Sequence, residues 1–360
     1  MKTRALVAST AALMLLAPTA LAHAAPPRPA ATNLAGPLHL SVGPGKAVTV
    51  SESFASKLTR VDRKGRSAVI YSAPDWSVEG SEYRGSTLYF VESQGAGPED
   101  QRPLAGSLKA INAKGKVSTI TDQLGAYERS ANPDQAVSYG LSASDAAANP
   151  ECVAQMTAIG FPASYTGADN VDSHPYAVEV VGNTGYIADA GMNAVLSVNL
   201  KTGAIDTIAV LPSRPAVITA AAAETFGLPA CEGLTYRFEA VPTDVEVGPD
   251  GWLYVSSLPG GPEDASLGAR GAIFRVNPAT GATRLRIDGL LTPTGIALDG
   301  NGNIYVASLF GQGIYKIRSG STTANLFLAA QNAAAVEISG STLYATTQAF
   351  GNGTLVSKRL

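Results

Sequence analysis

One pattern recurs along this chain, and its fullest copy occupies residues 241–277, VPTDVEVGPDGWLYVSSLPGGPEDASLGARGAIFRVN. It consists of an alternating segment, a tight turn at 248–251, a second segment with aromatic residues, a Gly- and Pro-rich excursion and a third alternating segment. A looser copy begins at Trp76, and four further copies begin at Pro37, His174, Thr292 and Asn332. The chain therefore contains six copies of one structural unit.

Each copy is typical of antiparallel β-strands joined by tight turns. Apolar and polar residues alternate with a period of two, and Asn and Gly occupy turns such as 301–302. Undecorated copies repeat after 40 residues, the step from Pro293 to Ala333. A four-stranded unit repeated at this spacing buries its two faces only against neighbouring units. We therefore predict an all-β fold, a six-bladed β-propeller with four-stranded antiparallel blades.

The two ends of the chain are predicted to meet in the last blade. The final copy ends with its third strand at 354–359, and no fourth strand follows before Leu360. An unpaired outer edge would invite aggregation. We expect residues 30–34 to supply the missing outer strand and so close the ring.

The long insertions are predicted to lie on one face of the ring. They occupy residues 95–105, 122–172, 212–240 and 259–270, and each lies between the second and third strands of a blade or between two blades. Loops of these two kinds emerge on the same side of an up-and-down blade. Ala-rich stretches at 144–157 and 218–226 favour short helices inside the two largest insertions. We call this side the decorated face and expect it to bind partners, because rigid scaffolds carry function on their loops.

The N-terminus has the features of a secretion signal. Lys2 and Arg4 precede an apolar run at 6–16, and Ala22-His23-Ala24 is typical of a cleavage site. We predict a signal peptide over residues 1–24, a single domain over 25–360 and a secreted protein. The apolar run is too short to cross a bilayer, so we expect no membrane span.

Composition and cysteine content narrow the class further. The net charge is −3 and the basic residues are scattered, which excludes a nucleic-acid-binding surface. A charged fraction of only 15% and 37 Gly fit a turn-rich β protein, which we expect to be monomeric. Cys152 and Cys231 are an even pair in an exported chain, so a disulfide is favoured over two buried thiols.

The first strands of the copies carry acidic residues in one register. That register contains small residues together with Glu179, Glu246 and Glu337, and it is predicted to line the central tunnel. Such carboxylates could hold a divalent cation such as Ca²⁺ or Mg²⁺. The alternative is a water-filled tunnel in which each carboxylate pairs with Arg or with backbone.

Two further motifs are candidate sites, each with a structural alternative. Glu99-Asp100 and Glu263-Asp264 each follow Gly-Pro. These acidic pairs could bind calcium, or they could cap the backbone amides of a turn. We favour the turn-capping role. His174 precedes the first strand of the third copy and could act as a metal ligand, as a general base or as a loop hydrogen-bond partner.

Several families of catalyst are excluded by missing motifs. The sequence has no G-x-S-x-G, no H-E-x-x-H, no phosphate-binding loop and no dinucleotide fingerprint. Only two histidines follow the signal peptide, which excludes a three-histidine zinc site.

The segment PTGIALDGNGNIYVA at 293–307 resembles NHL-type propeller repeats. Together with the segment 241–264 and the cysteine-bearing insertions, it makes the whole mature chain resemble the ScyD/ScyE family of exported propellers. This resemblance implies a propeller fold, but it does not imply a particular reaction. A more distant similarity is to gluconolactonase-like six-bladed propellers, whose tunnel holds a divalent metal through Glu, Asn and Asp. That similarity implicates Glu79 and Asp244, whereas the family's Asn positions have no assignable match.

Two functional hypotheses remain. The first is a binding or scaffold protein that engages an unknown small molecule or protein through the decorated face, with Glu99, Asp100, Glu263, Asp264 and Arg270 in its loops. The second is a metal-dependent hydrolase or lactonase at the tunnel mouth, with Glu79, Asp172, His174 and Asp244 as ligands or base. We favour binding, because the sequence contains no recognisable pairing of nucleophile and base.

Overall fold

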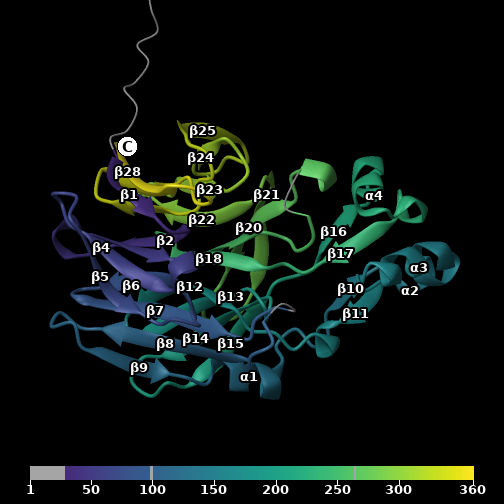
Figure 1. Cartoon of the computed structure of the whole chain (residues 1–360), viewed down its shortest axis with the longest axis horizontal. Coiled ribbons are helices and arrows are strands. Elements are labelled where there is room, and N and C mark those ends of the chain that lie inside the picture. The colour runs from purple at the N-terminus through teal and green to yellow at the C-terminus, as the bar shows by residue number, and fades with distance from the viewer. Residues whose placement is uncertain (1–28, 98–99, 263–264) are drawn as a thin grey trace, which may run out of the picture.

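The computed structural model describes residues 29–97, 100–262 and 265–360, and it contains seven four-stranded antiparallel sheets (Figure 1). The predicted signal peptide at 1–24 lies outside the described residues, as do Glu99, Glu263 and Asp264. Within the described part of the chain, no helix is both long and apolar enough to cross a membrane.

Five sheets are formed by consecutive strands, as the repeats predict. Their strands are β2 (Pro37–Val42), β3 (Val48–Glu52), β4 (Lys57–Val61) and β5 (Ser67–Ser72); β6 (Ser77–Arg84), β7 (Thr87–Gln94), β8 (Ala105–Ile111) and β9 (Val117–Thr121); β12 (Pro175–Val181), β13 (Thr184–Asp189), β14 (Ala194–Asn199) and β15 (Ile205–Val210); β18 (Pro242–Val247), β19 (Leu253–Ser257), β20 (Gly271–Val276) and β21 (Thr283–Leu290); and β22 (Pro293–Leu298), β23 (Ile304–Ser308), β24 (Gly313–Ile317) and β25 (Ala324–Ala329).

The sixth sheet joins the two ends of the described chain. It consists of β26 (Val336–Ser339), β27 (Thr342–Thr347), β28 (Gly353–Arg359) and, as its outer strand, β1 (Pro29–Leu34). In the β1 and β28 pairing, Leu34 lies opposite Gly353, and its side chain is buried. The predicted pairing of residues 30–34 with the last strand is therefore confirmed.

The first strands of these six sheets contact one another in a closed cycle, in the order β2, β6, β12, β18, β22, β26 and back to β2. The alternation of the strands places one apolar register between neighbouring sheets. For example, Ala188 and Val195 pack in one cluster with Val255 and Phe274 of the next sheet. The core of the ring thus consists of apolar layers between adjacent sheets.

The seventh sheet was not predicted, and it is built from the two largest insertions. Its strands are β10 (Ser138–Gly140), β11 (Ser164–Thr166), β16 (Arg214–Val217) and β17 (Thr235–Phe238), in the order β11-β10-β17-β16. Helices α2 (Ala143–Ala148), α3 (Pro150–Ala158) and α4 (Ala220–Phe226) cover it, and the predicted short helices are confirmed. We call residues 138–166 and 214–238 the accessory module, which extends to the right in Figure 1.

The accessory module has its own core and a covalent link. Cys152 of α3 and Cys231 form the predicted disulfide, which joins the two insertions, and both residues are fully buried. The remaining short helices are α1 (Leu124–Ala131) and the 3₁₀ turns η1 (Pro44–Lys46), η2 (Ser53–Ala55), η3 (Gly167–Asp169), η4 (Pro229–Cys231) and η5 (Ala265–Leu267).

Candidate functional site

Four glutamates lie in equivalent positions along the central tunnel. Each is opposite a tyrosine of the second strand of its sheet, in the pairs Glu82 and Tyr89, Glu179 and Tyr186, Glu246 and Tyr254, and Glu337 and Tyr344. Asp244, two residues before Glu246, also faces the tunnel. Glu82, Asp244, Glu246 and Glu337 line a cavity of only about 20 Å³, which is room for about one water molecule.

Small residues make the tunnel this narrow. A Cβ atom on Gly80 would lie 2.6 Å from the Ala177 Cα, and one on Gly295 would lie 2.9 Å from the Ala335 Cα. These first strands therefore approach too closely for any larger side chain at that level. An organic ligand cannot enter so small a space.

The tunnel carboxyls hold protons more tightly than exposed ones. Burial raises the pKa of Glu179 and of Asp244 to about 7, and it raises the pKa of Glu337 to about 8, with repulsion from neighbouring carboxylates adding to the Asp244 and Glu337 shifts. Burial and repulsion also raise the pKa values of Glu82 and Glu246 well above the usual range. The cluster is therefore only partly ionised near neutral pH.

Backbone amides donate hydrogen bonds to tunnel carboxylates, including those of Asp244 and Glu337. Asp244 accepts hydrogen bonds from the amides of Val245 and, in the neighbouring sheet, Ile296, at 2.9 and 2.7 Å. Glu337 accepts one from the amide of Ile338 at 2.6 Å. The pairing of tunnel carboxylates with backbone, part of one of the two sequence interpretations, is thus found in the tunnel.

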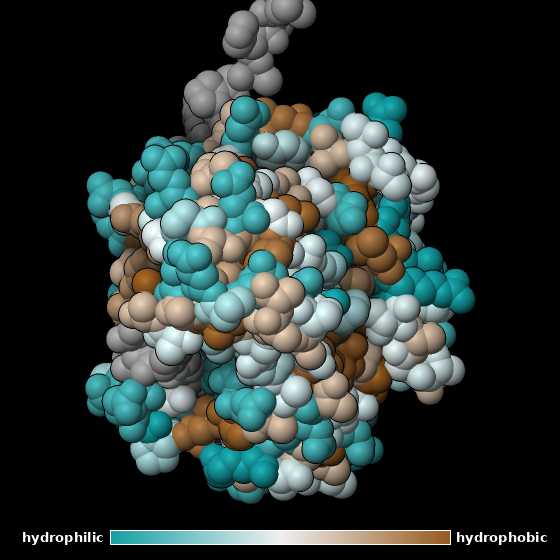
Figure 2. Space-filling model, turned by 90° about the vertical axis from the view of Figure 1, so that its right-hand side faces the viewer, coloured by the Kyte–Doolittle hydropathy of each residue, from teal (hydrophilic) through white to brown (hydrophobic). Residues whose placement is uncertain are grey.

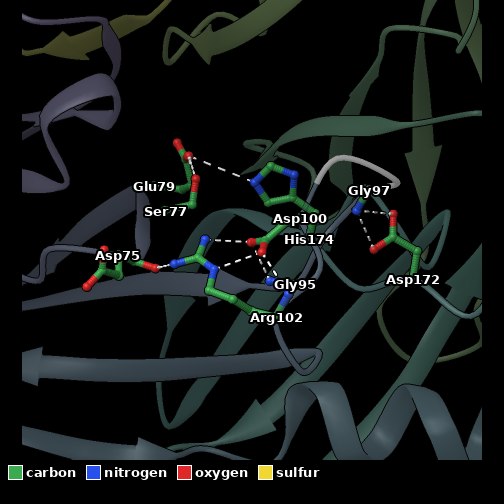
Figure 3. Close-up of polar contacts among 9 residues, drawn as sticks. All are labelled: Asp75, Ser77, Glu79, Gly95, Gly97, Asp100, Arg102, Asp172 and His174. Carbon is green, nitrogen blue, oxygen red and sulfur yellow. Dashed lines mark hydrogen bonds and ion pairs between the residues drawn. The ribbon is translucent and has the colours of Figure 1, made fainter.

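A buried carboxylate lies between two histidines at the tunnel mouth. The Oε1 atom of Glu79 is 3.8 Å from Nε2 of His174 (Figure 3). Its Oε2 atom is 3.5 Å from Nε2 of His39. Ser53 and Ser77 donate hydrogen bonds to the two Glu79 oxygens, both at 2.7 Å. The side chain of Glu79 is 3% exposed and that of His174 30%, so His174 is the member that solvent reaches.

The pKa values of the two histidines shift in opposite directions. Burial lowers the pKa of His39 to about 4 despite the nearby Glu79. Burial would also lower the pKa of His174, but the interaction with Glu79 outweighs it and the net shift is upward. Burial alone would raise the pKa of Glu79, and His174 and His39 more than offset it, so this pKa is lowered. His39 is therefore neutral near pH 7, and His174 is the histidine whose protonated form Glu79 favours.

The neighbouring loop residues stabilise turns. Asp100 binds the Arg102 guanidinium at 2.5 and 2.7 Å and accepts the amide hydrogen of Gly95 at 2.7 Å (Figure 3). Arg102 also donates to the backbone oxygen of Asp75. Asp172 accepts a hydrogen bond from the amide of Gly97 at 3.2 Å. The turn-capping interpretation of Asp100 is thus confirmed.

The predicted metal ligands do not form one site. Of the four proposed residues, Glu79 and His174 come together, whereas Asp172 binds Gly97 and Asp244 binds Ile296. Among the described residues, no three His, Cys, Asp or Glu side chains are arranged to hold a metal ion. The described residues therefore do not fit a resident metal ion.

A second cavity lies in the accessory module and is lined almost entirely by apolar side chains. Its volume is about 300 Å³, within the range of small-molecule sites. We call it the apolar pocket. Its walls come from α3, α4, β17 and residues next to them, together with Gly261 and Pro262. The other apolar side chains that line it are those of Met156, Ile159, Phe161, Ile218, Ala222, Phe226, Leu228, Tyr236, Phe238 and Leu267. Figure 2 shows apolar side chains gathered among polar ones on this side of the molecule.

An acidic pocket of about 390 Å³ adjoins the apolar one. Its lining includes Tyr165, Asp169, Asn170 and Glu239. Tyr165 and Asn170 both donate hydrogen bonds to Oε1 of Glu239, each at 3.0 Å. This pocket therefore has polar lining residues, whereas the residues that it shares with the apolar pocket are aromatic rings and Gly261.

Arg270, a predicted ligand-face residue, positions a loop at the edge of these pockets. Its guanidinium lies 4.5 Å from the centre of the Phe238 ring and donates hydrogen bonds to the carbonyls of Gly260 and Pro262 at 3.0 and 2.6 Å. These contacts hold the 260–262 turn against β17.

Sequence reasoning missed Glu82 and both pockets. Glu82 lies seven residues before Tyr89, the same spacing that separates Glu179 from Tyr186 and Glu337 from Tyr344, so this signal was present in the sequence. A register irregularity between Val78 and Ser81 obscured it. The pockets carry no comparable signal, because their walls combine residues from three separate segments.

Comparisons with known proteins agree on the fold. A beta-propeller repeat family model (SBBP) matches residues 286–309, and a search of the curated proteins found no match. A gluconolactonase from Xanthomonas campestris superposes with a TM-score of 0.53 at 13% identity, over 91% of this chain and 88% of that one. A Bacteroides thetaiotaomicron protein of unknown function gives 0.54 at 10% identity, over 91% and 70%. Virginiamycin B lyase from Staphylococcus aureus gives 0.48 at 14% identity, over 90% and 84%. The chain has a β-propeller fold.

The tunnel carboxyls predict an unusual pH dependence of stability. In the folded protein Glu337 keeps its proton from its ordinary pKa of 4.5 up to about 8, and Glu179 and Asp244 keep theirs up to about 7, where the unfolded chain has released them. The free energy of unfolding should therefore fall as the pH rises through this window. Glu337→Gln, which removes one such proton, should match the parent protein at pH 4. At pH 8 it should be more stable by more than about 1.4 kcal/mol, the equivalent of one pKa unit.

Urea unfolding at several pH values checks this expectation. Glu232→Gln, at an exposed position of the accessory module, is the matched control and should follow the parent at every pH. Equal stabilities of the parent and Glu337→Gln at pH 8 would contradict the assignment of a raised pKa to Glu337.

Proposed function

We propose that this protein is a binding protein whose accessory module holds an apolar small molecule on the decorated face. The observation that carries this proposal is the apolar pocket. A water-exposed hollow lined by Met, Leu, Ile and Phe is costly unless something apolar occupies it, because its surface would otherwise contact water. Ile159 is 52% exposed and Phe226 39% exposed at this site.

The construction of the module supports a binding role. The disulfide fixes α3 to the segment that follows α4, and both helices contribute to the pocket wall. Thr219 donates a hydrogen bond to the carbonyl of Ser266 at 2.6 Å, which ties the start of α4 to the loop that completes the pocket. A pocket that is held in shape before binding loses less conformational entropy when a ligand enters.

The architectural part of the proposal is a ring of six blades to which the accessory sheet is added. It is supported by the closed cycle of six first strands and by the origin of the seventh sheet in two insertions. We also propose that the chain is a secreted, single-domain member of the ScyD/ScyE family, on the basis of the N-terminal signal and the sequence resemblance.

Binding of Nile red, a neutral apolar dye, tests the proposed function. The mature protein should bind it saturably, with one site and a blue-shifted emission. Ile159→Asp places a charge at the pocket edge and should weaken binding at least about tenfold, because the bound dye would desolvate the carboxylate.

The control is Leu285→Asp on β21, where the side chain is 51% exposed, closely matched to the 52% of Ile159. It should bind the dye like the parent. Equal binding by Ile159→Asp and the parent would place the dye elsewhere, and the absence of saturable binding would reject the pocket as a binding site.

Hydrolysis at the tunnel mouth is the second candidate function, favoured by the pairing of Glu79 with the partly exposed His174. Above its pKa, the neutral imidazole of His174 could accept a proton from water, and Glu79 would stabilise the imidazolium that forms. A screen of lactones and aryl esters tests it. An activity that falls at least about a hundredfold in His174→Gln, and is unchanged in the exposed control Glu224→Gln, would support this role. Hydrolysis that survives His174→Gln, or none at all, would exclude it.

A further inference from the structure

We propose that the ligand of the accessory module is a cationic amphiphile, whose apolar body occupies the apolar pocket and whose ammonium head lies in the acidic pocket beside Glu239. This inference rests on the proposed function and specifies the chemical class of its ligand. It is drawn from the shape, charge and aromatic lining of the two adjoining cavities.

The two pockets are positioned to hold one molecule. Phe161, Tyr236, Phe238 and Gly261 belong to the walls of both. Beyond these shared residues, the apolar pocket is lined by apolar side chains, and the acidic pocket is lined in part by carboxylate, amide and hydroxyl groups. A molecule with an apolar end and a polar end satisfies both sides, whereas a purely apolar molecule leaves the acidic pocket without a partner.

The charge of the lining selects a cation. Glu239 and Asp169 line the acidic pocket, and no Lys, Arg or His lines either cavity in the described part of the chain. Asp169 accepts hydrogen bonds from the amide and hydroxyl of Thr166, both at 2.9 Å, and these lower its pKa and keep it ionised. Burial raises the pKa of Glu239, against the opposing hydrogen bonds from Tyr165 and Asn170. A bound cation would favour the ionised form of Glu239.

Aromatic rings provide the second element of ammonium recognition. The Phe161 and Tyr236 rings lie 5.1 Å apart, and the Tyr236 and Phe238 rings lie 4.7 Å apart, between their centres. Tyr165 adds a fourth ring to the acidic pocket. Rings and carboxylates together are the combination that binds quaternary ammonium groups, through cation–π attraction and charge.

The positive charge of Arg270 lies near the pockets and disfavours a cationic head group. Its guanidinium lies over Phe238, and its hydrogen bonds go to the carbonyls of Gly260 and Pro262. Because Arg270 does not line either cavity, we assign the head-group preference to Glu239 and Asp169. The opposite preference would show that Arg270 dominates.

Three probes with the same ten-carbon chain test the inference: decyltrimethylammonium, decanoate and the neutral decyl glucoside. Each is titrated calorimetrically into the mature protein below its micelle concentration. The cation should bind at least about fivefold more tightly than the other two, which corresponds to the usual strength of one exposed cation–π or ion-pair contact.

Two variants locate the head group. Glu239→Gln keeps the acceptor for Tyr165 and Asn170 while removing the charge, and it should abolish most of the preference for the cation. Asp169→Asn, at an exposed position, should reduce it in part. Glu232→Gln, also exposed and in the same module, should leave it unchanged.

The outcomes separate this inference from the proposed function. Equal affinities for all three probes, with binding still lost in Ile159→Asp, would overturn the head-group assignment and leave the apolar pocket as the binding site. Tighter binding of decanoate would overturn it in favour of Arg270. No binding of any probe would reject the proposed function itself. A cation preference that survives both Glu239→Gln and Asp169→Asn would place the ammonium group elsewhere.

Discussion

The close approach of neighbouring first strands determines where this molecule can act. At the level of Gly80 and Gly295, any Cβ atom would lie within 3.0 Å of the adjacent strand, a distance that packed atoms do not tolerate. The ring is therefore tight at its centre. What remains is a cavity of about 20 Å³ among carboxyl groups. The titration of these carboxyls makes the stability of the fold depend on pH, and the cavity among them has too little space for an organic ligand.

The decorated face provides that space by adding a second, smaller core to the ring. The accessory module buries its own cluster of apolar residues around the disulfide, and this cluster is left open where α3, α4 and the 260–262 turn meet. Arg270 fixes that turn by stacking on Phe238. A rigid scaffold with a locally open core is a general arrangement for ligand binding, because the scaffold bears the folding free energy and the loops form the site.

Much of the ring could be predicted from the sequence, because the repeats encode it locally. The alternation and turns around Asn301 predicted β22 and β23, and the missing fourth strand after β28 predicted its pairing with β1. The accessory sheet could not be predicted in this way. Its strands have only three or four residues, and β10 pairs with β17 from another insertion. The sequence therefore contains no hairpin pattern that would predict this sheet. The pockets could not be predicted for the same reason, because their walls combine residues that are far apart in the sequence, such as Met156, Phe226 and Leu267.

Hydrogen exchange measured by mass spectrometry, with and without decyltrimethylammonium, tests the central claim most directly. Binding in the accessory module should slow exchange in residues 156–161 and 220–239, with little change in the first strands at 175–181 and 242–247. Slower exchange in those first strands, with no change in the accessory module, would place the ligand at the tunnel and contradict the account.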